Sequence, residues 1–161
     1  MRFQNSWRVQ LMTTFEGEIR PELYADKTSV LEVLEAQGQN CTATDPNTKI
    51  TAPLLIDVRS ELQFNGVVRR AVRSGRIPGA VGLPFKRLFA APGKLLNSAE
   101  LRHVFESVGV TDGRSVIVYC NGGVSACIAA AAAELAGFPD WRVYDGSWNE
   151  WGNDTSVPIE I

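Results

Sequence analysis

The residues of this sequence that could do chemistry lie close together in residues 119–126. Cys120 comes directly after an apolar run, and Gly122 and Gly123 separate it from an alanine-rich stretch that starts at Val124. Glycines let the backbone curl, so that successive N–H groups converge on one point. A helix beginning there adds positive partial charge. Both effects favour a thiolate and predict that Cys120 is a nucleophile; the alternative is a small buried cysteine beside a tight turn.

The sequence offers Cys120 cations rather than a histidine base. His103, the one histidine, falls on the polar face of its predicted helix, which argues against a Cys–His pair and a hydrolase of the papain type. Residues 59–94 carry a single acid, Glu61, and these basic residues: Arg59, Arg69, Arg70, Arg73, Arg76, Lys86, Arg87 and Lys94. Most of them are typical of a solvated face. We expect one or two beside Cys120, where they would bind an anionic substrate.

The elements that position Cys120 alternate between strand and helix. Apolar runs predict strands at 54–58, 79–83, 115–119 and 142–144, and a short edge strand at 20–25. Capping signals and periodicity predict helices at 26–38, 97–109 and 124–136, with a surface loop at 39–49. This alternation predicts an α/β domain with a mostly parallel sheet, in which Cys120 follows the carboxyl end of a strand. Cys127, in the last helix, is expected to be buried.

Length and composition exclude several classes of protein. The chain has 161 residues, of which 45% are hydrophobic and 21% charged, which fits one folded domain. Residues 20–161 are expected to form that domain, and residues 1–19 an arm or linker. A net charge of −2 gives no attraction to nucleic acid or to an anionic membrane. The start does not read as a secretory signal, and three cysteines form no even framework, so a reducing, cytoplasmic location is expected.

Four segments, in the same order, resemble the rhodanese-type sulfurtransferases. Residues 120–126 resemble the active-site loop of that family, and residues 55–59 resemble its strand ending in Asp-x-Arg. Residues 74–80 resemble its Gly-His-Ile-Pro-Gly-Ala element, and residues 144–151 its Asp-Gly-Ser-Trp stretch. The resemblance covers roughly residues 52–152. It implies a rhodanese-like, open and mostly parallel sheet with helices on both faces.

The family's chemistry implies a role for Cys120. Its thiolate is expected to take the outer sulfur of thiosulfate or a similar anionic donor as a persulfide, and to pass that sulfur to cyanide or a thiol. No metal and no organic cofactor is needed. Substrate-binding residues are expected in the loop and in the basic stretch: Asn121, Gly122, Gly123, Val124, Ser125, Arg59, Arg69 and Arg70. Asp57 and Arg59 are expected to hold loops together through a charge-assisted hydrogen bond.

Departures from the family's patterns bear on the sulfur donor. Mercaptopyruvate-specific members carry a Ser or Thr hydroxyl where this chain has Gly122, and thiosulfate-specific animal members carry Arg-Lys in place of Asn121 and Gly122. Two-domain members often have an arginine where this chain has Gln63, so Arg69 or Arg70 is expected to replace it. The missing hydroxyl and the basic stretch favour thiosulfate over mercaptopyruvate.

Two alternatives to a small-molecule enzyme stay open. Catalytically silent modules share this fold, although the presence of Cys120 favours an enzyme. A sulfur-relay protein would instead pass its persulfide to a protein acceptor. The chain resembles the second half of two-domain members, whose other half covers one side of the active site, so a second rhodanese-like domain is a further expected partner. Without it, Phe85, Leu88 and Phe89 would form an exposed docking patch, unless they pack beneath the site.

Overall fold

A five-stranded parallel sheet forms the centre of the protein. The computed structural model describes residues 20–40 and 52–161. The strands run in the order β1 (Tyr24–Ala25), β7 (Trp141–Tyr144), β6 (Val116–Tyr119), β2 (Leu54–Asp57) and β3 (Val81–Gly82). Each pair of neighbouring strands is parallel. The predicted α/β class with an open, mostly parallel sheet is confirmed.

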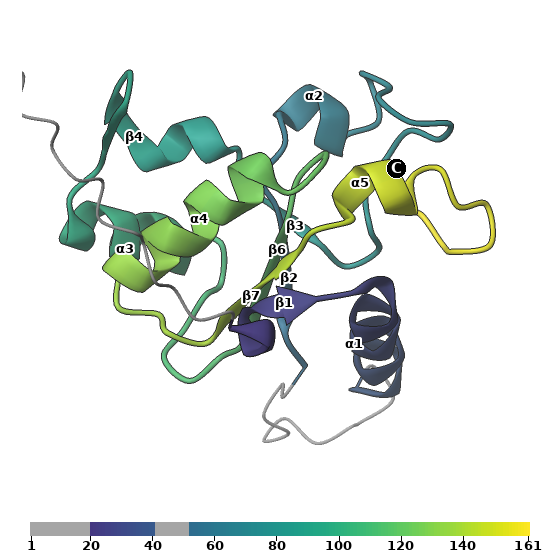
Figure 1. Ribbon diagram of the computed structural model, residues 1–161, viewed down its shortest axis with the longest axis horizontal. Coiled ribbons are helices and arrows are strands. Elements are labelled where there is room, and N and C mark those ends of the chain that lie inside the picture. The colour runs from purple at the N-terminus through teal and green to yellow at the C-terminus, as the bar shows by residue number, and fades with distance from the viewer. Residues whose placement is uncertain (1–19, 41–51) are drawn as a thin grey trace, which may run out of the picture.

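Helices cover both faces of this sheet, as predicted (Figure 1). The helices α3 (Ser98–Glu106) and α4 (Val124–Leu135) lie on one face, and α1 (Lys27–Asn40) and α5 (Ser147–Trp151) lie on the other. Shorter elements complete the described chain: the 3-10 turns η1 (Pro21–Leu23) and η2 (Phe85–Leu88), the helix α2 (Glu61–Phe64), and the antiparallel pair β4 (Phe89–Ala91) and β5 (Lys94–Leu95).

The two central strands explain why both faces need cover. Every residue of β2 and β6 is buried, which suits continuous apolar runs between two layers of helices. Alternate residues face opposite ways, so Ile56 and Val118 pack with the α3 and α4 side of the core, whereas Leu55 and Ile117 pack with Trp148 on the other. This arrangement fixes where the loops after β2 and β6 begin.

Local signals set most element boundaries, with some differences from the predictions. Asn97 and Glu100 form the expected capping box at the start of α3. Helix α1 continues past Gly38 to Asn40, because a glycine inside a helix costs only about 1 kcal/mol and does not have to end it. The predicted strands at 20–25 and 79–83 shrink to two residues each. Residues 1–19 and most of the predicted loop at 39–49, with Cys41, lie outside the described residues.

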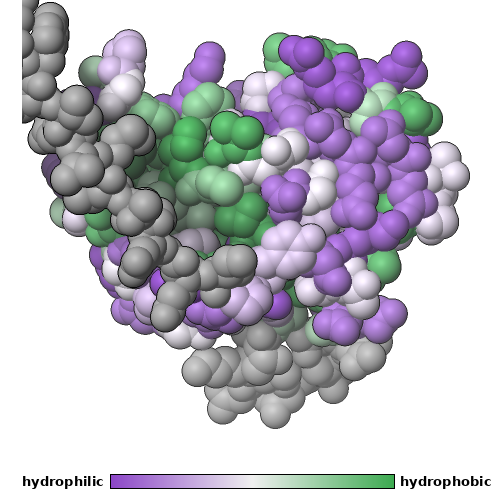
Figure 2. Space-filling model, in the orientation of Figure 1, coloured by the Kyte–Doolittle hydropathy of each residue, from purple (hydrophilic) through white to green (hydrophobic). Residues whose placement is uncertain are grey.

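The surface is unevenly apolar. Figure 2 shows hydrophobic residues gathered over α4 and hydrophilic ones over the side that carries α5. None of the helices in residues 20–40 and 52–161 is long and apolar enough to cross a membrane.

Candidate active site

The candidate site lies at the carboxyl ends of two neighbouring strands, β2 and β6, from which the chain continues in opposite directions along the sheet. Strand β2 leads through α2 to β3 on one side, and β6 leads through α4 to β7 on the other. In open α/β sheets, ligands bind beyond the carboxyl ends of strands at such a switch point. The Val58 N–H donates to the Tyr119 carbonyl at 2.9 Å, so the residues following β2 and β6 start side by side.

A cavity of about 590 Å³ opens at this point. That volume lies within the range of small-ligand sites, about 300–1,000 Å³. These residues line it: Val58, Arg59, Ser60, Gln63, Val68, Arg70, Phe85, Cys120, Asn121, Ser125 and Asn149. The described lining residues include two arginines and no Asp, Glu, His or Lys, which suits an anionic ligand.

Cys120 lies in this cavity with 4% of its surface exposed, between the end of β6 and the start of α4. Gly123 is the N-cap of α4 and has a φ of 83°, in the left-handed region. A Cβ there would lie 2.5 Å from the Asp145 carboxylate, so only glycine fits the turn. The predicted arrangement of Cys120 between a strand and a helix N-terminus is confirmed.

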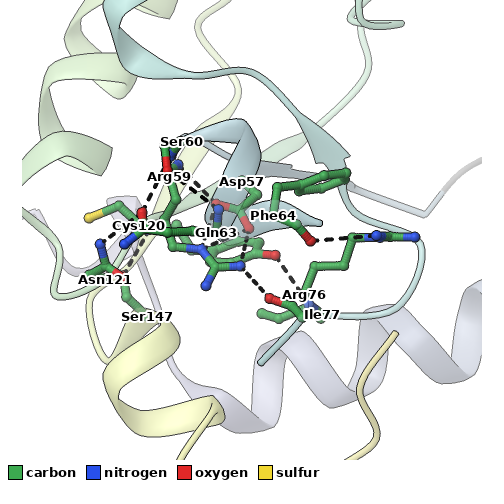
Figure 3. Close-up of polar contacts among 12 residues, drawn as sticks. Asp57, Arg59, Ser60, Gln63, Phe64, Arg76, Ile77, Cys120, Asn121 and Ser147 are labelled. Atoms are coloured by element: carbon green, nitrogen blue, oxygen red, sulfur yellow. Dashed lines mark hydrogen bonds and ion pairs between the residues drawn. The ribbon is translucent and has the colours of Figure 1, made fainter. Parts of the chain in front are cut away.

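Ser147 holds the loop in place from the opposite side of the chain. Its Oγ accepts the Cys120 N–H at 3.1 Å (Figure 3). The same Oγ accepts the Gly123 N–H at 3.2 Å and donates to the Tyr144 carbonyl at 2.8 Å. The Gly123 N–H therefore bonds inside the protein rather than to a ligand. The N–H groups of Gly122 and Ser125 have no hydrogen-bond partner within the described part of the chain, which leaves them free to donate to an anion.

Arg59 is buried and already paired. Its guanidinium forms an ion pair with Asp57 at 2.6 Å (Figure 3). It also donates to the Gly75 carbonyl at 2.7 Å and stacks 4.3 Å from the centre of the Trp148 ring. The expected role of Asp57 and Arg59 in holding loops together is confirmed. Arg59 also lines the cavity, but Asp57 balances its charge.

The structure distinguishes the two remaining arginine candidates by whether they line the cavity. Arg70 and Arg69 are both exposed, and Arg70 alone of the two lines the cavity. Gln63, which stands in the place of the family's arginine, is buried and forms a capping box with Ser60 at the start of α2. Its side-chain oxygen also faces the Asn121 amide at 3.5 Å. Arg70 is thus the one exposed cation in the cavity lining among the described residues.

The predicted loop residues divide into lining and turn. Asn121 and Ser125 line the cavity, while Gly122 and Gly123 form the turn between them and Val124 begins α4. Four further residues line the cavity and were not predicted to bind substrate: Ser60, Val68, Phe85 and Asn149. Ser60 could have been found, because Ser-x-x-Gln after a strand is a capping-box pattern.

Two side chains outside the cavity complete the comparison with the predictions. His103 is exposed on α3, as expected, and does not line the cavity. Cys127 is exposed, so the prediction that it is buried was wrong: it lies on the outward side of α4, whose alanines Ala126 and Ala130 face the sheet. Partial burial, Asp145 and Cys120 raise the pKa of the Cys127 thiol, which makes it a poorer nucleophile.

The protein is thus an α/β domain with a cysteine at a helix N-terminus. Unpaired N–H groups and an arginine lie beside that cysteine, which suits thiol chemistry on anions. The chain belongs to the rhodanese-like domain family, whose sequence profile matches residues 41–154. This assignment confirms the resemblance noted in the sequence.

Known relatives are similar to this chain over part of their length. It is 37% identical over 108 residues to thiosulfate/3-mercaptopyruvate sulfurtransferase 1, mitochondrial, of Arabidopsis thaliana, covering 65% of this chain and 28% of that protein. It is 34% identical to the sulfur carrier protein TtuD of Thermus thermophilus, covering 65% and 40%. It is 31% identical to the putative thiosulfate sulfurtransferase SseB of Mycobacterium tuberculosis, covering 96% and 54%. The chain thus spans roughly a quarter to a half of the length of these relatives.

A solved structure is also similar. A variant of EanB, described as a complex with ergothioneine covalently linked with a cysteine persulfide, matches with a TM-score of 0.70 and 26% identity, covering 88% of this chain and 32% of that one.

Proposed function

We propose that this domain is a sulfurtransferase that carries sulfane sulfur as a persulfide on Cys120. The observation that carries the proposal is the position of Cys120 in a cavity with free N–H groups, a rim arginine and no acidic lining residue among those described. Such a site suits the binding of an anionic donor. A reducing, cytoplasmic location suits this chemistry, because thiol acceptors must stay reduced.

The proposed transfer has two balanced steps. The Cys120 thiolate attacks the outer sulfur of thiosulfate, the S–S bond of the donor breaks, and sulfite leaves with the bonding electron pair. Cyanide or a thiolate then attacks the outer sulfur of the Cys120 persulfide, and the Cys120 thiolate leaves. We assign binding of the transferred sulfur or the donor to Asn121, Gly122 and Ser125, and binding of the departing anion to Arg70; the support is that Asn121, Ser125 and Arg70 line the cavity and that the Gly122 and Ser125 N–H groups are free in the described part of the chain.

The cavity chemistry favours thiosulfate as the donor over mercaptopyruvate. Sulfite leaves as a stable anion without taking a proton. With 3-mercaptopyruvate the C–S bond breaks and pyruvate leaves as its enolate, whose carbon must be protonated, and the described lining residues include no His, Lys, Asp or Glu for that task. We expect kcat/KM to be higher with thiosulfate; a value more than ten times higher with mercaptopyruvate would reverse this assignment.

Intact mass tests the persulfide directly. After incubation with thiosulfate and desalting, the protein is expected to gain one sulfur, about 32 Da, and to lose it on addition of cyanide, because Cys120 lies in the anion-binding cavity. Cys120→Ser is expected to gain nothing. Cys127→Ser is the matched control, since Cys127 is an exposed thiol with a raised pKa, and it is expected to behave as the parent. A cyanide-labile sulfur that survives in Cys120→Ser would overturn the proposal.

A protein acceptor is a second candidate, favoured by the surface beside the cavity. Phe85 lines both the Cys120 cavity and an apolar groove of about 490 Å³ that continues along Phe89, Ala91 and Pro92. Of the predicted patch, Leu88 is fully buried, so Phe85 and Phe89 alone are partly exposed. An apolar groove that shares Phe85 with the Cys120 cavity suits a protein that must bring its own thiol to Cys120.

The two candidate acceptors are distinguished by a variant of the groove. Phe89→Ala replaces no residue of the cavity lining, since Phe89 lines the groove and not the cavity. It does remove the ring that packs edge-on against Phe85, so transfer to cyanide reports whether the cavity itself is disturbed. If a protein thiol docks in the groove, this change is expected to slow sulfur transfer from Cys120 persulfide to reduced thioredoxin by about tenfold and leave transfer to cyanide unchanged. If the variant transfers sulfur to thioredoxin as fast as the parent does, no protein thiol docks in this groove, and small molecules remain as the acceptors.

A further inference from the structure

We propose that Asn149 is a donor-specificity residue, which occupies the space above Gly122 and presents its amide to the sulfonate oxygens of the donor. The inference rests on the proposed sulfur transfer and names the substrate class that this cavity selects. It assigns a function to a residue that lies outside the cysteine loop, on the opposite helix α5.

Helix α5 is tied to the cysteine loop through its backbone. The Trp148 N–H donates to the Cys120 carbonyl at 3.0 Å, and the Asn149 N–H donates to the Asn121 carbonyl at 2.8 Å. These two bonds place the backbone of Asn149 directly against the loop. Because Ser147 also accepts two N–H groups of the loop, four hydrogen bonds join α5 to the loop.

The Asn149 side chain takes the space that a side chain at position 122 would need. A Cβ built on Gly122 would lie 3.0 Å from the Asn149 amide nitrogen, closer than ordinary van der Waals contact. Within the described residues, no atom outside the neighbouring backbone and Asn149 comes within 4 Å of that Cβ, and Gly122 does not need the left-handed region. The Asn149 amide is therefore the obstacle to a side chain at position 122.

Gly123 provides the contrast. There a Cβ would meet the Asp145 carboxylate at 2.5 Å, and φ is 83°. Position 123 requires glycine because of its backbone conformation, whereas a side chain at position 122 would meet only the exposed Asn149 side chain, which would have to shift.

The chemistry of the amide fits an oxyanion. Asn149 lines the cavity with Cys120 and Arg70, and its amide N–H groups can donate to the oxygens of a sulfonate while Arg70 balances the charge. A hydroxyl side chain at position 122 would displace that amide. Asn149 and a Ser or Thr at position 122 are thus alternatives for one space, and the choice between them selects the donor: sulfonate-type donors with Asn149, other donors with the hydroxyl.

A double-mutant cycle tests the inference. The variants are Asn149→Ala, Gly122→Ser and the double variant, with Gly123→Ser as the backbone control and Asn149→Asp as the isosteric control that removes the amide donors. The half-saturating donor concentration and the limiting rate of persulfide formation are measured with thiosulfate and with 3-mercaptopyruvate. Thermal unfolding of the same proteins without donor is measured in parallel.

The two amide changes test recognition of the donor. Asn149→Ala is expected to raise the half-saturating thiosulfate concentration about tenfold and to change the limiting rate by less than about twofold, as for one lost hydrogen bond to a charged group. Asn149→Asp is expected to weaken thiosulfate binding further, because it adds a negative charge. If both variants bind thiosulfate as the parent does, Asn149 does not recognise the donor.

The cycle tests the shared space. Gly122→Ser is expected to lower Tm by about 2–4 °C in the parent and by less than half of that in Asn149→Ala, where the serine also improves the use of 3-mercaptopyruvate relative to thiosulfate. Gly123→Ser is expected to be destabilising in both backgrounds. Additive effects of the two changes on Tm would overturn the steric part. Since Tm needs no donor, a failure of the proposed sulfur transfer, seen as no persulfide on the parent, is distinguished from a failure of this inference.

Discussion

A single hydroxyl from another part of the chain shapes the loop around the nucleophile. Ser147 is fully buried, and its Oγ accepts the N–H groups of Cys120 and Gly123, which lie 27 and 24 residues earlier. Its φ of 52° is in the left-handed region, which is costly for a residue other than glycine. A conformation of this kind persists where the surrounding contacts outweigh its cost.

We predict that Ser147→Ala lowers the free energy of unfolding by about 2–3 kcal/mol. The change leaves two buried N–H groups without an acceptor, at a cost of about 1–3 kcal/mol each before relaxation. It also loosens the loop, so persulfide formation on Cys120 is expected to slow. Urea unfolding and the rate of the mass change with thiosulfate measure both effects.

Ser147→Gly is the control for backbone strain. It loses the same hydroxyl but relieves the positive φ, so it is expected to be more stable than Ser147→Ala by up to about 1 kcal/mol and to form persulfide equally slowly. An alanine variant with the stability of the parent would show that the hydroxyl does not hold the loop.

The residue types around Cys120 show what sequence reasoning can reach. Cys120, Asn121 and Ser125 are contiguous with the glycine turn, and local rules place them at a helix N-terminus. Ser147 and Asn149 reach the same place through tertiary packing, which no local pattern encodes. Their segment was recognised by its resemblance to a family motif, without a role for either side chain.

At the scale of elements, α1 and the end of α5 are joined across one face of the sheet. Lys27 at the start of α1 donates to Asp154, just after α5, at 2.8 Å. Hydrogen bonds from Lys27 and from the Ser156 hydroxyl and N–H hold the pKa of Asp154 well below its ordinary value. A carboxylate of this kind adds stability only while it is ionised.

This pairing predicts how stability depends on pH. The folded pKa of Asp154 is depressed, so its contribution is present above the unfolded pKa, near about 3.9, and is lost as pH falls from there towards the folded pKa. Asp154→Asn is therefore expected to be less stable than the parent at pH 7, and the difference is expected to shrink below about pH 4. Urea unfolding of both proteins at pH 7, 5, 4 and 3 measures this; a difference as large at pH 3 as at pH 7 would contradict it.

Elements were predicted well where a period or a cap could be seen, and poorly where neither exists. The strands β2 and β6 and the helices α3 and α4 follow apolar runs and capping signals. Helix α5 has five residues, too few for a period, and α2 has four. These two short helices contribute Gln63 and Asn149 to the lining of the cavity, so this part of the lining could not be predicted.

At the scale of the whole molecule, arginines connect parts of the chain that are distant in sequence. In the sequence, Arg73 is one member of a basic stretch. In the structure, its guanidinium donates to the carbonyls of Val157 at 2.8 Å and Trp151 at 2.9 Å, and also to that of Asp154. Arg76 forms an ion pair with the Glu160 carboxylate. These hydrogen bonds and this ion pair hold residues 151–160 against residues 73–76 (Figure 1).

The last prediction concerns this fastening. Arg73→Met keeps most of the length and apolar stem of the side chain but removes every donor, leaving the carbonyls of Trp151 and Val157 without their charged partner. We expect the free energy of unfolding to fall by about 3 kcal/mol, because hydrogen bonds to a charged group contribute about 1.5–3 kcal/mol each and neighbouring bonds are not additive. Arg69→Met is the matched control, since Arg69 is exposed, and is expected to change stability by less than about 0.5 kcal/mol. Urea unfolding measures both variants.

Because Trp151 belongs to α5, which carries Ser147, the folded fraction of Arg73→Met is also expected to form persulfide more slowly than that of Arg69→Met. Equal unfolding midpoints for the two variants would show that the hydrogen bonds of Arg73 do not stabilise the position of residues 151–160.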